Sequence, residues 1–305
     1  MDGSRTAARI DAPAAALPAV WRDRATVGAF VLLWCTGYPA GKIAVDHGAP
    51  FTVLAMRFGT AAAIFAIPAL LGRAPRPSRA DVWHNIVIGV LSLSIAFGGV
   101  YAGLSLGVST GIAALIVGAM PLTTALFATL YGERLSLRQW AGLALGFAGI
   151  ALVLEGRFDS HGAPLAGYLA SIAGLFALSY GTLYQKRHSS HVDVRVGLAV
   201  QHATALAVLL PIAAFVEHFK ADWSGTYIAA MGWLVLLNSV GGFAVFYVLL
   251  QRGAATGVAA LFYLMPPITA LIGFAVLGEK LTLPMLPGFL LVVVGVWLGT
   301  RRAPR

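Results

Sequence analysis

Charged side chains are scarce in this chain of 305 residues. Asp, Glu, Lys and Arg make up 11% of the sequence and hydrophobic residues make up 59%, whereas an average soluble domain has about 25% charged residues. A water-soluble fold of this length would need many more charged side chains to cover its core. The scarcity excludes an ordinary soluble protein and predicts an all-α integral membrane protein surrounded by the lipid bilayer.

Cysteine and catalytic motifs are also nearly missing. Cys35 is the single cysteine, which excludes a disulfide framework or a cysteine metal site and leaves a small apolar packing residue. The sequence has no Gly-rich phosphate loop, no His-Glu-x-x-His and no Gly-x-Ser-x-Gly. We therefore predict that the protein is not an enzyme, that no residue is catalytic, and that it has no cofactor and no metal site.

Acidic residues are fewer than basic ones, so the formal net charge is +9. A nucleic-acid-binding protein gathers its Lys and Arg residues on one face. Here they fall in short clusters between long apolar runs, which argues against a nucleic-acid partner.

No carboxylate is expected in the middle of a membrane span, because all twelve Asp and Glu residues fall in loops, in the N-terminal tail or at helix ends. Proton-driven carriers usually place an ionisable group inside the membrane. His202 is therefore the candidate coupling residue. Arg57 also lies inside a predicted span, and we expect its guanidinium to snorkel to the external interface rather than face the bundle.

Ten apolar runs are long enough to cross a bilayer, which takes about 20 residues of helix. They are 26–45, 51–71, 82–104, 109–131, 137–155, 164–186, 194–216, 226–250, 256–277 and 282–300. With this division, 16 Lys and Arg residues lie on the side of both termini and four on the other. The positive-inside rule then predicts cytoplasmic termini in a multi-pass protein of a bacterial inner membrane.

The chain repeats itself when it is shifted by 146 residues. The match pairs Gly132-Glu133-Arg134-Leu135 with Gly278-Glu279-Lys280-Leu281, and Pro121 with Pro267. Each half would have five helices, an odd number, so the second half must be inverted in the membrane. The prediction is two inverted five-helix repeats with these bounds: a cytoplasmic tail over 1–25, a first repeat over 26–155 and a second repeat over 164–300.

Aromatic pairs spaced by four residues occur on four helices that the repeat makes equivalent in pairs. They are Trp34 with Tyr38, Phe97 with Tyr101, Tyr180 with Tyr184, and Phe243 with Tyr247. We predict that these faces, together with Tyr263, line one substrate cavity at the midplane, although plain packing is the alternative. Asn238, Ser92 and Ser94 would add polar contacts. Pro121 and Pro267 are candidate gating hinges, because each frees a carbonyl one turn earlier.

The repeated pattern Thr-Gly-x-Ala-Ala-Leu, Pro-x-Thr and Gly-Glu-[Arg/Lys]-Leu, followed by a Gly-rich helix, resembles the EamA repeat of the drug/metabolite transporter superfamily. The resemblance implies ten helices, cytoplasmic termini and export of metabolites, with a cavity lined chiefly by helices one, three, four, six, eight and nine. The aromatic face is most similar to YddG-type amino-acid exporters.

Three functions follow as hypotheses. The first is a monomeric exporter of small metabolites, above all aromatic or other neutral amino acids, that works by alternating access. The second is an exporter of drugs and cationic compounds, since aromatic cavities hold cations through cation–π contacts. The third is a passive, channel-like facilitator.

Overall fold

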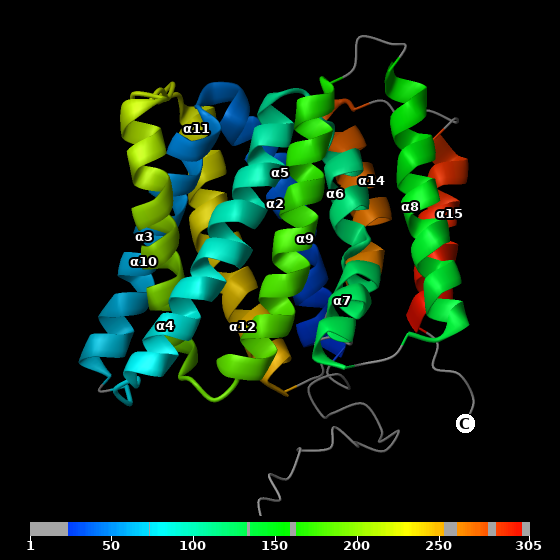
Figure 1. Cartoon of the computed structure of the whole chain (residues 1–305). Coiled ribbons are helices and arrows are strands. Elements are labelled where there is room, and N and C mark those ends of the chain that lie inside the picture. The colour runs from blue at the N-terminus through cyan, green and yellow to red at the C-terminus, as the bar shows by residue number, and fades with distance from the viewer. Residues whose placement is uncertain are drawn as a thin grey trace, which may run out of the picture.

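The computed structural model describes residues 24–72, 74–132, 135–158, 163–252, 261–279 and 285–300. These residues form a bundle of helices that run side by side (Figure 1). The described part of the chain contains no sheet, and its only β element is an isolated antiparallel bridge between Gly48 and Ala221. The predicted N-terminal tail over 1–25 lies almost wholly outside the described residues.

The described residues of the first half form seven α-helices in chain order: α2 (Arg24–His47), α3 (Pro50–Leu71), α4 (Arg79–Ile88), α5 (Ala96–Ser105), α6 (Thr110–Gly118), α7 (Met120–Ala128) and α8 (Leu137–Phe158). The π-helix η1 (Gly89–Ile95) joins α4 to α5, and the 3-10 helix η2 (Thr129–Tyr131) follows α7. The predicted span over 109–131 is therefore broken into shorter pieces.

The described residues of the second half contain six α-helices: α9 (Leu165–His188), α10 (Val194–Phe215), α11 (Gly225–Gly232), α12 (Phe243–Arg252), α14 (Met265–Leu277) and α15 (Met285–Thr300). The π-helix η3 (Trp233–Gly242) joins α11 to α12, and the 3-10 helix η4 (Phe262–Leu264) precedes α14. The beginnings of the predicted helices 256–277 and 282–300 lie outside the described residues.

Seven helical segments of the described chain are long and apolar enough to cross a membrane: Thr26–His47, Pro50–Leu71, Arg79–Ser105, Thr110–Tyr131, Leu165–His188, Val194–Phe215 and Gly225–Arg252. Three shorter apolar helices are Leu137–Leu152, Met265–Leu277 and Leu286–Gly295. The all-helical membrane architecture is confirmed, while the count of ten crossings stays a prediction.

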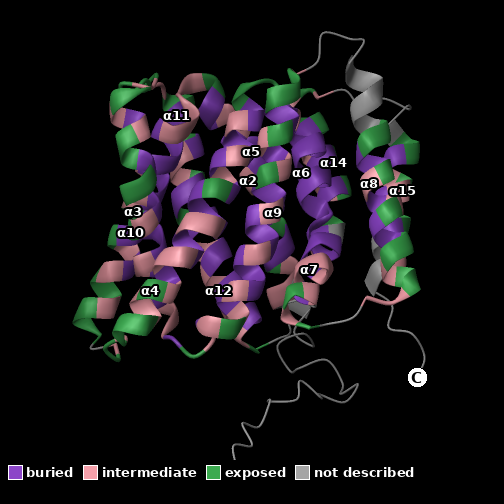
Figure 2. Cartoon of the chain, in the orientation of Figure 1, coloured by how far each residue is buried: buried purple, intermediate pink, exposed green. Residues whose placement is uncertain are grey.

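Exposed residues lie on the outside of the bundle and buried residues lie in its interior (Figure 2), and large apolar residues are found in both groups. Leu71 is 80% exposed and Phe215 is also 80% exposed, whereas Phe58 and Cys35 are fully buried. An outward apolar surface is what a lipid solvent selects, because helices already satisfy their backbone hydrogen bonds. The burial of Cys35 confirms its expected packing role.

The glycines of the two Gly-Glu loops end their helices in the same way. Gly132 has φ of 85° after η2, and Gly278 has φ of 65° after α14. Only glycine adopts this left-handed conformation without strain, and it is the usual residue just beyond a helix end. The matching sequence signature thus produces matching turns in the two halves.

Helices at equivalent repeat positions pack against each other. The contacting pairs are α3 with α10 and α8 with α15, and α6 also contacts α14, which belongs to the equivalent predicted span. In addition, α5 packs on α9 and α2 packs on η3. The two halves are therefore interleaved, and the centre of the bundle is built from both.

Candidate functional site

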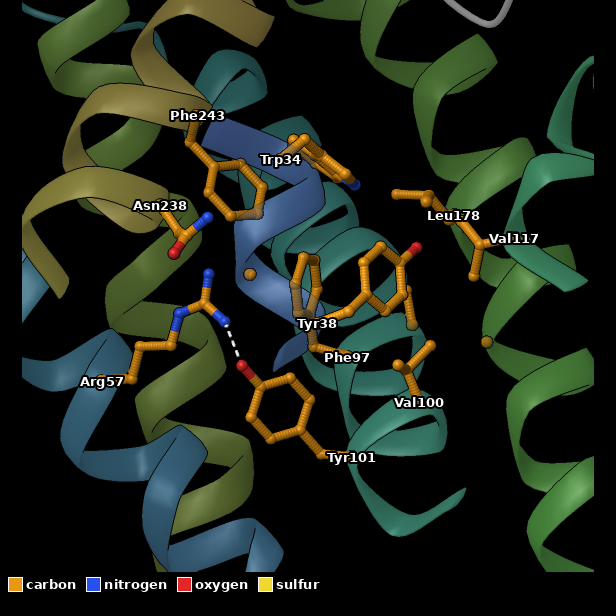
Figure 3. A pocket seen from close by; sticks show the side chains of 13 residues that line it. Trp34, Tyr38, Arg57, Phe97, Val100, Tyr101, Val117, Leu178, Asn238 and Phe243 are labelled. Atoms are coloured by element: carbon orange, nitrogen blue, oxygen red, sulfur yellow. Dashed lines mark hydrogen bonds between the residues drawn. The ribbon is translucent and has the colours of Figure 1, made fainter. Parts of the chain in front are cut away.

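A buried cavity lies in the centre of the bundle, between helices of both halves. It offers about 40 Å³ to water-sized molecules, which is room for a few waters. Its lining residues come from α2, α3, α5, α6, α9, η3 and α12: Trp34, Gly37, Tyr38, Arg57, Ala96, Phe97, Val100, Tyr101, Val117, Gly174, Leu178, Asn238 and Phe243 (Figure 3). Polar groups are few in this apolar interior, and in ligand pockets such groups usually fix the orientation of the ligand.

Three aromatic rings form one wall of the cavity. The Trp34 ring lies 6.1 Å from Phe97 and 5.4 Å from Phe243, measured between ring centroids, and the Phe97 and Phe243 rings are 5.4 Å apart. Phe97 and Phe243 are equivalent in the repeat. Equivalent residues of the two halves thus meet at the centre, within the range of aromatic pairing distances.

The one charged side chain among the cavity residues is Arg57 of α3. It is only 2% exposed, so the prediction that it snorkels to the interface is wrong. Its Nε donates to Ser239 Oγ at 2.7 Å, and its Nη1 donates to Tyr101 OH at 2.7 Å. Its Cζ also lies 5.0 Å from the Phe97 ring centroid. These partners, contributed by α5 and η3, hold the guanidinium inside the bundle instead of at the lipid surface.

Asn238 of η3 faces the same cavity. Its Nδ2 donates to the Leu33 carbonyl, while its Oδ1 is buried with no hydrogen-bond partner. Gly37 makes room for it, because a Cβ at Gly37 would lie 2.9 Å from Asn238 Nδ2. In the same way, a Cβ at Gly41 would lie 2.8 Å from Tyr101 OH. Two glycines of α2 therefore shape the polar part of the cavity.

Three of the predicted substrate residues lie away from this cavity. Tyr131 OH donates to Tyr180 OH at 3.4 Å, and Tyr184 OH lies 2.8 Å from His84 Nδ1. Tyr247 OH donates to the Ser189 carbonyl at 3.0 Å. The structure thus brings together five of the predicted residues, and it does not bring these three to them. The side chain of Tyr263 lies outside the described residues. The aromatic pairs on the helices were found by sequence, but the repeat could not tell which pairs share a cavity.

The two polar serines that were expected near the site lie outside its lining. Ser94 Oγ donates to the Gly89 carbonyl at 3.2 Å, inside η1. Ser92 Oγ is buried without a partner, and it lies against Gly181, where a Cβ would be 2.2 Å away. Both serines therefore take part in helix packing next to the cavity.

Both candidate hinge prolines lie in the first turn of a helix that follows a break. Pro121 is the second residue of α7, which follows Ala119, whose ψ of 1° interrupts the helix, and Pro267 is the third residue of α14, which follows η4. A proline in the first turn costs no hydrogen bond. The two breaks also touch, since a Cβ at Gly118 would lie 2.6 Å from Pro266 Cγ.

Two π-helices occupy equivalent places in the halves. In the repeat register, η1 (89–95) corresponds to 235–241 of η3. Each π-helix leads directly into cavity residues, Phe97 after η1 and Phe243 after η3. Single π-turns inside α-helices are frequent at functional sites. No sequence signal predicted them, because π-turns have no dependable composition.

His202 lies behind the aromatic wall. It is fully buried, its ring is 5.3 Å from Phe243 and 5.5 Å from Phe58, and its Nδ1 lies 2.8 Å from the Leu198 carbonyl. Its Nε2 has no hydrogen-bond partner. His202 is therefore packed among aromatic rings and has one ring nitrogen left for a further hydrogen bond.

Two carboxylates join the halves at one end of the bundle. Glu217 follows α10 and accepts from Thr52 N at 2.6 Å and from Thr52 Oγ1 at 2.9 Å. Glu279 follows α14 and accepts from Thr110 N at 2.8 Å and Thr110 Oγ1 at 2.8 Å. Each carboxylate satisfies free amides at the N-terminus of a first-half helix, where the helix dipole also favours negative charge.

The long apolar helices, the interleaved halves and the central cavity define a multi-pass membrane transporter. The sequence pattern of the EamA-like transporter family matches the chain twice, over residues 26–155 and 165–301. The chain belongs to this family, which is one of transporters and not of enzymes.

Curated relatives cover nearly the whole chain. The "Uncharacterized transporter YvbV" of Bacillus subtilis is 28% identical over 271 residues, which span 88% of each chain. The "Probable amino-acid metabolite efflux pump" of Salmonella typhimurium is 25% identical over 88% of this chain and 91% of its own. The "Uncharacterized inner membrane transporter YedA" of Escherichia coli is 27% identical over 83% of this chain and 82% of its own. A solved crystal structure shares the fold, with a TM-score of 0.66 and 24% identity over 90% of this chain and 95% of the other.

Proposed function

We propose that this transporter exports small amphipathic metabolites, above all neutral amino acids, through the cavity at the centre of the bundle. The observation that carries the proposal is the cavity itself, which both halves enclose and in which aromatic rings stand beside a buried guanidinium and an amide. Such a lining suits a molecule with an apolar side chain and a polar end. The relatives named as probable amino-acid metabolite efflux pumps support the same substrate class.

Alternating access by two inverted five-helix repeats explains how such a cavity opens. A two-fold axis in the membrane plane would pair each helix with its own equivalent, as in the contacts of α3 with α10 and α8 with α15. The cavity has room for only a few waters, so helices must separate to admit an amino acid. The breaks at Pro121 and Pro267 and the two π-helices are the proposed hinges.

The alternatives have less support. An exporter of cationic drugs would place its substrate against Arg57, a buried positive charge, which costs electrostatic energy. A passive channel needs a continuous path, whereas Glu217 and Glu279 join the halves across one end of the bundle. We propose a monomeric carrier that follows the substrate gradient, with His202 as the one candidate for proton coupling.

Transport in proteoliposomes tests this function. Radiolabelled L-phenylalanine should enter with saturation kinetics, and unlabelled L-phenylalanine on the opposite side should accelerate it by counter-transport. The variant His202→Ala should keep counter-transport, because the substrate gradient drives it. Non-saturable flux without counter-transport would favour a channel, and flux of a quaternary ammonium drug instead of L-phenylalanine would favour the drug exporter.

The proposed orientation has ten spans and both termini in the cytoplasm. Single cysteines at Ser78 and Ser224, in a Cys35→Ser background, lie at the starts of α4 and α11 at opposite ends of the bundle (Figure 1). In intact cells, an impermeant maleimide should label the cysteine at Ser224 and spare the one at Ser78. The reverse pattern would overturn the orientation, and labelling of both would overturn the inverted topology.

A further inference from the structure

Arg57 is a buried cation with no carboxylate beside it in the described structure. The ion pairs of the described residues lie elsewhere, at helix ends: Lys42 with Asp46, His191 with Asp81, and Arg195 with Asp193. The Arg57 guanidinium remains charged inside a protein, and burying a charge without a counter-charge is costly. A membrane helix that keeps such a group gains something other than stability from it.

The hydrogen bonds of Arg57 leave one side of the guanidinium free. Nε and Nη1 donate to Ser239 and Tyr101, whereas Nη2 has no hydrogen-bond acceptor among the described residues. The group points between Asn238 and Phe243, into the cavity (Figure 3). Two neutral oxygens therefore fix the orientation of the guanidinium without neutralising it. A fixed, unneutralised guanidinium is a carboxylate receptor, because its fork of donors matches a carboxylate.

A free acceptor lines the same cavity as this free donor. Asn238 Oδ1 is buried without a hydrogen-bond partner, although its Nδ2 donates to Leu33 O. In the close view, Oδ1 faces the Arg57 guanidinium across the cavity (Figure 3). An unsatisfied buried acceptor costs free energy unless a ligand supplies a donor. An ammonium group is such a donor, with three N–H bonds.

We propose that Arg57 and Asn238 form a receptor for the zwitterionic end of an amino acid. Arg57 binds the carboxylate, Asn238 Oδ1 accepts a hydrogen bond from the ammonium group, and the aromatic wall of Trp34, Phe97 and Phe243 holds an apolar side chain. This assignment rests on the proposed function and adds to it the two side chains that recognise the substrate. It makes the carboxylate obligatory and the ammonium group secondary, because the stronger interaction involves the full charge of Arg57.

Only one half carries this receptor. In the repeat register, Ala203 stands where Arg57 does, and Ser92 stands where Asn238 does. Neither Ala203 nor Ser92 is among the cavity residues. The substrate is therefore held in one orientation, with its polar end toward α3 and η3, while the roughly symmetric aromatic rings Phe97 and Phe243 lie at the centre.

Three probes with the same phenylethyl skeleton separate the contributions of the carboxylate and the ammonium group to binding. They are L-phenylalanine, 3-phenylpropanoate, which lacks the ammonium group, and phenethylamine, which lacks the carboxylate. Binding is measured by the rise in melting temperature of the purified protein, since a ligand of the folded state stabilises it. Inhibition of labelled L-phenylalanine transport is the second measurement. The wild type should bind L-phenylalanine best, 3-phenylpropanoate next, and phenethylamine about tenfold more weakly or worse.

Two variants test the receptor without relying on one substitution. Arg57→Met should lose affinity for both carboxylates by about tenfold or more, and it should melt no lower than the wild type, because an unneutralised buried charge is removed. Asn238→Asp keeps Arg57 but gives it an internal carboxylate, and it should also lose both ligands. The matched control Arg195→Gln, at a partly exposed pair outside the cavity, should bind as the wild type does.

The outcomes distinguish this inference from the proposed function. If Arg57→Met or Asn238→Asp binds L-phenylalanine as tightly as the wild type, the receptor is overturned and the exporter stands. Equal binding of phenethylamine and 3-phenylpropanoate by the wild type has the same meaning. If the wild type neither binds nor transports any of the three probes, both the receptor and the amino-acid function are wrong.

Discussion

Tyr101 and Tyr247 occupy equivalent positions in the two halves but have different surroundings. Tyr101 OH accepts from the buried Arg57 and lines the cavity. Tyr247 OH instead donates to the Ser189 carbonyl at the end of α9, within a network of neutral groups. The pair shows that the repeat keeps a residue and its helix, while each half supplies a different partner for the side chain from within itself.

The two halves also differ in how closely their helix backbones pack against neighbouring helices. Gly99 of α5 lies so close to α9 that a Cβ would be 2.2 Å from the Ala170 carbonyl oxygen. The equivalent residue of the second half is Val245, which is half-buried. The two halves thus share an order of helices without sharing every helix interface.

We expect the largest change in stability when Gly99 is replaced by the residue at the equivalent position of the second half, which is valine. Gly99→Val forces α5 and α9 apart, and we expect a loss of about 3 kcal/mol or more in the free energy of unfolding. Val245→Gly should cost only about 1 kcal/mol, mostly through helix propensity.

Thermal unfolding in detergent gives both values. Gly241→Ala is the matched glycine control, because its nearest neighbours would be 3.6 Å from the new Cβ, and it should melt near the wild type. An unchanged melting temperature in Gly99→Val would contradict the close approach of α5 and α9.

A smaller effect should separate the two tyrosines. Tyr101→Phe removes the acceptor of a hydrogen bond from a charged group, worth about 1.5–3 kcal/mol, whereas Tyr247→Phe removes neutral bonds worth about 0.5–1.5 kcal/mol each. Only Tyr101→Phe should also change the apparent affinity for L-phenylalanine, because it releases the guanidinium that faces the substrate. Unfolding and transport are measured on the same preparations. Equal effects of the two variants on affinity would mean that the cavity is not the site.

The smallest effects concern how equivalent helices α3 and α10 begin. The side chain of Arg195 donates to Asp193, the N-cap of α10, and holds the pKa of that carboxyl below its usual value. The start of α3 is instead capped by Glu217 from the other half. Glu217→Gln should cost about 1 kcal/mol, and Asp193→Asn only a few tenths at neutral pH, since Asn is also a good N-cap.

The pH dependence of stability tests the contribution of the Asp193 cap. Because the pKa of Asp193 is lowered by folding, its contribution is present above the usual carboxyl pKa of about 4 and is lost as the pH falls through the lowered value. The pair with Arg195 is partly exposed, so the change should stay below about 1 kcal/mol. Melting temperatures from pH 7 down to pH 3 should fall less steeply for Asp193→Asn than for the wild type. Parallel curves would show that the Asp193 carboxylate adds no stability.

Much of the fold follows from local sequence. The apolar runs predicted α3, α9 and α10 to within about two residues, since length and hydropathy alone mark a lipid-spanning helix. Pro121 and Pro267 were predicted as hinges, and each lies in the first turn of a helix that follows a break, but their bending stays a prediction. The π-helices η1 and η3 were not, since an extra residue in a turn is settled by the helices packed around it.

The sequence by itself determined that the chain lies in lipid, that it is helical, and that its two halves repeat, because these properties depend on composition and period. Only the tertiary structure decided which polar groups meet. Arg57 has enough reach to snorkel or to turn inward, and its sequence neighbours do not choose between them. The choice is made by Tyr101 and Ser239, which come from other helices and accept the hydrogen bonds of the guanidinium inside the bundle.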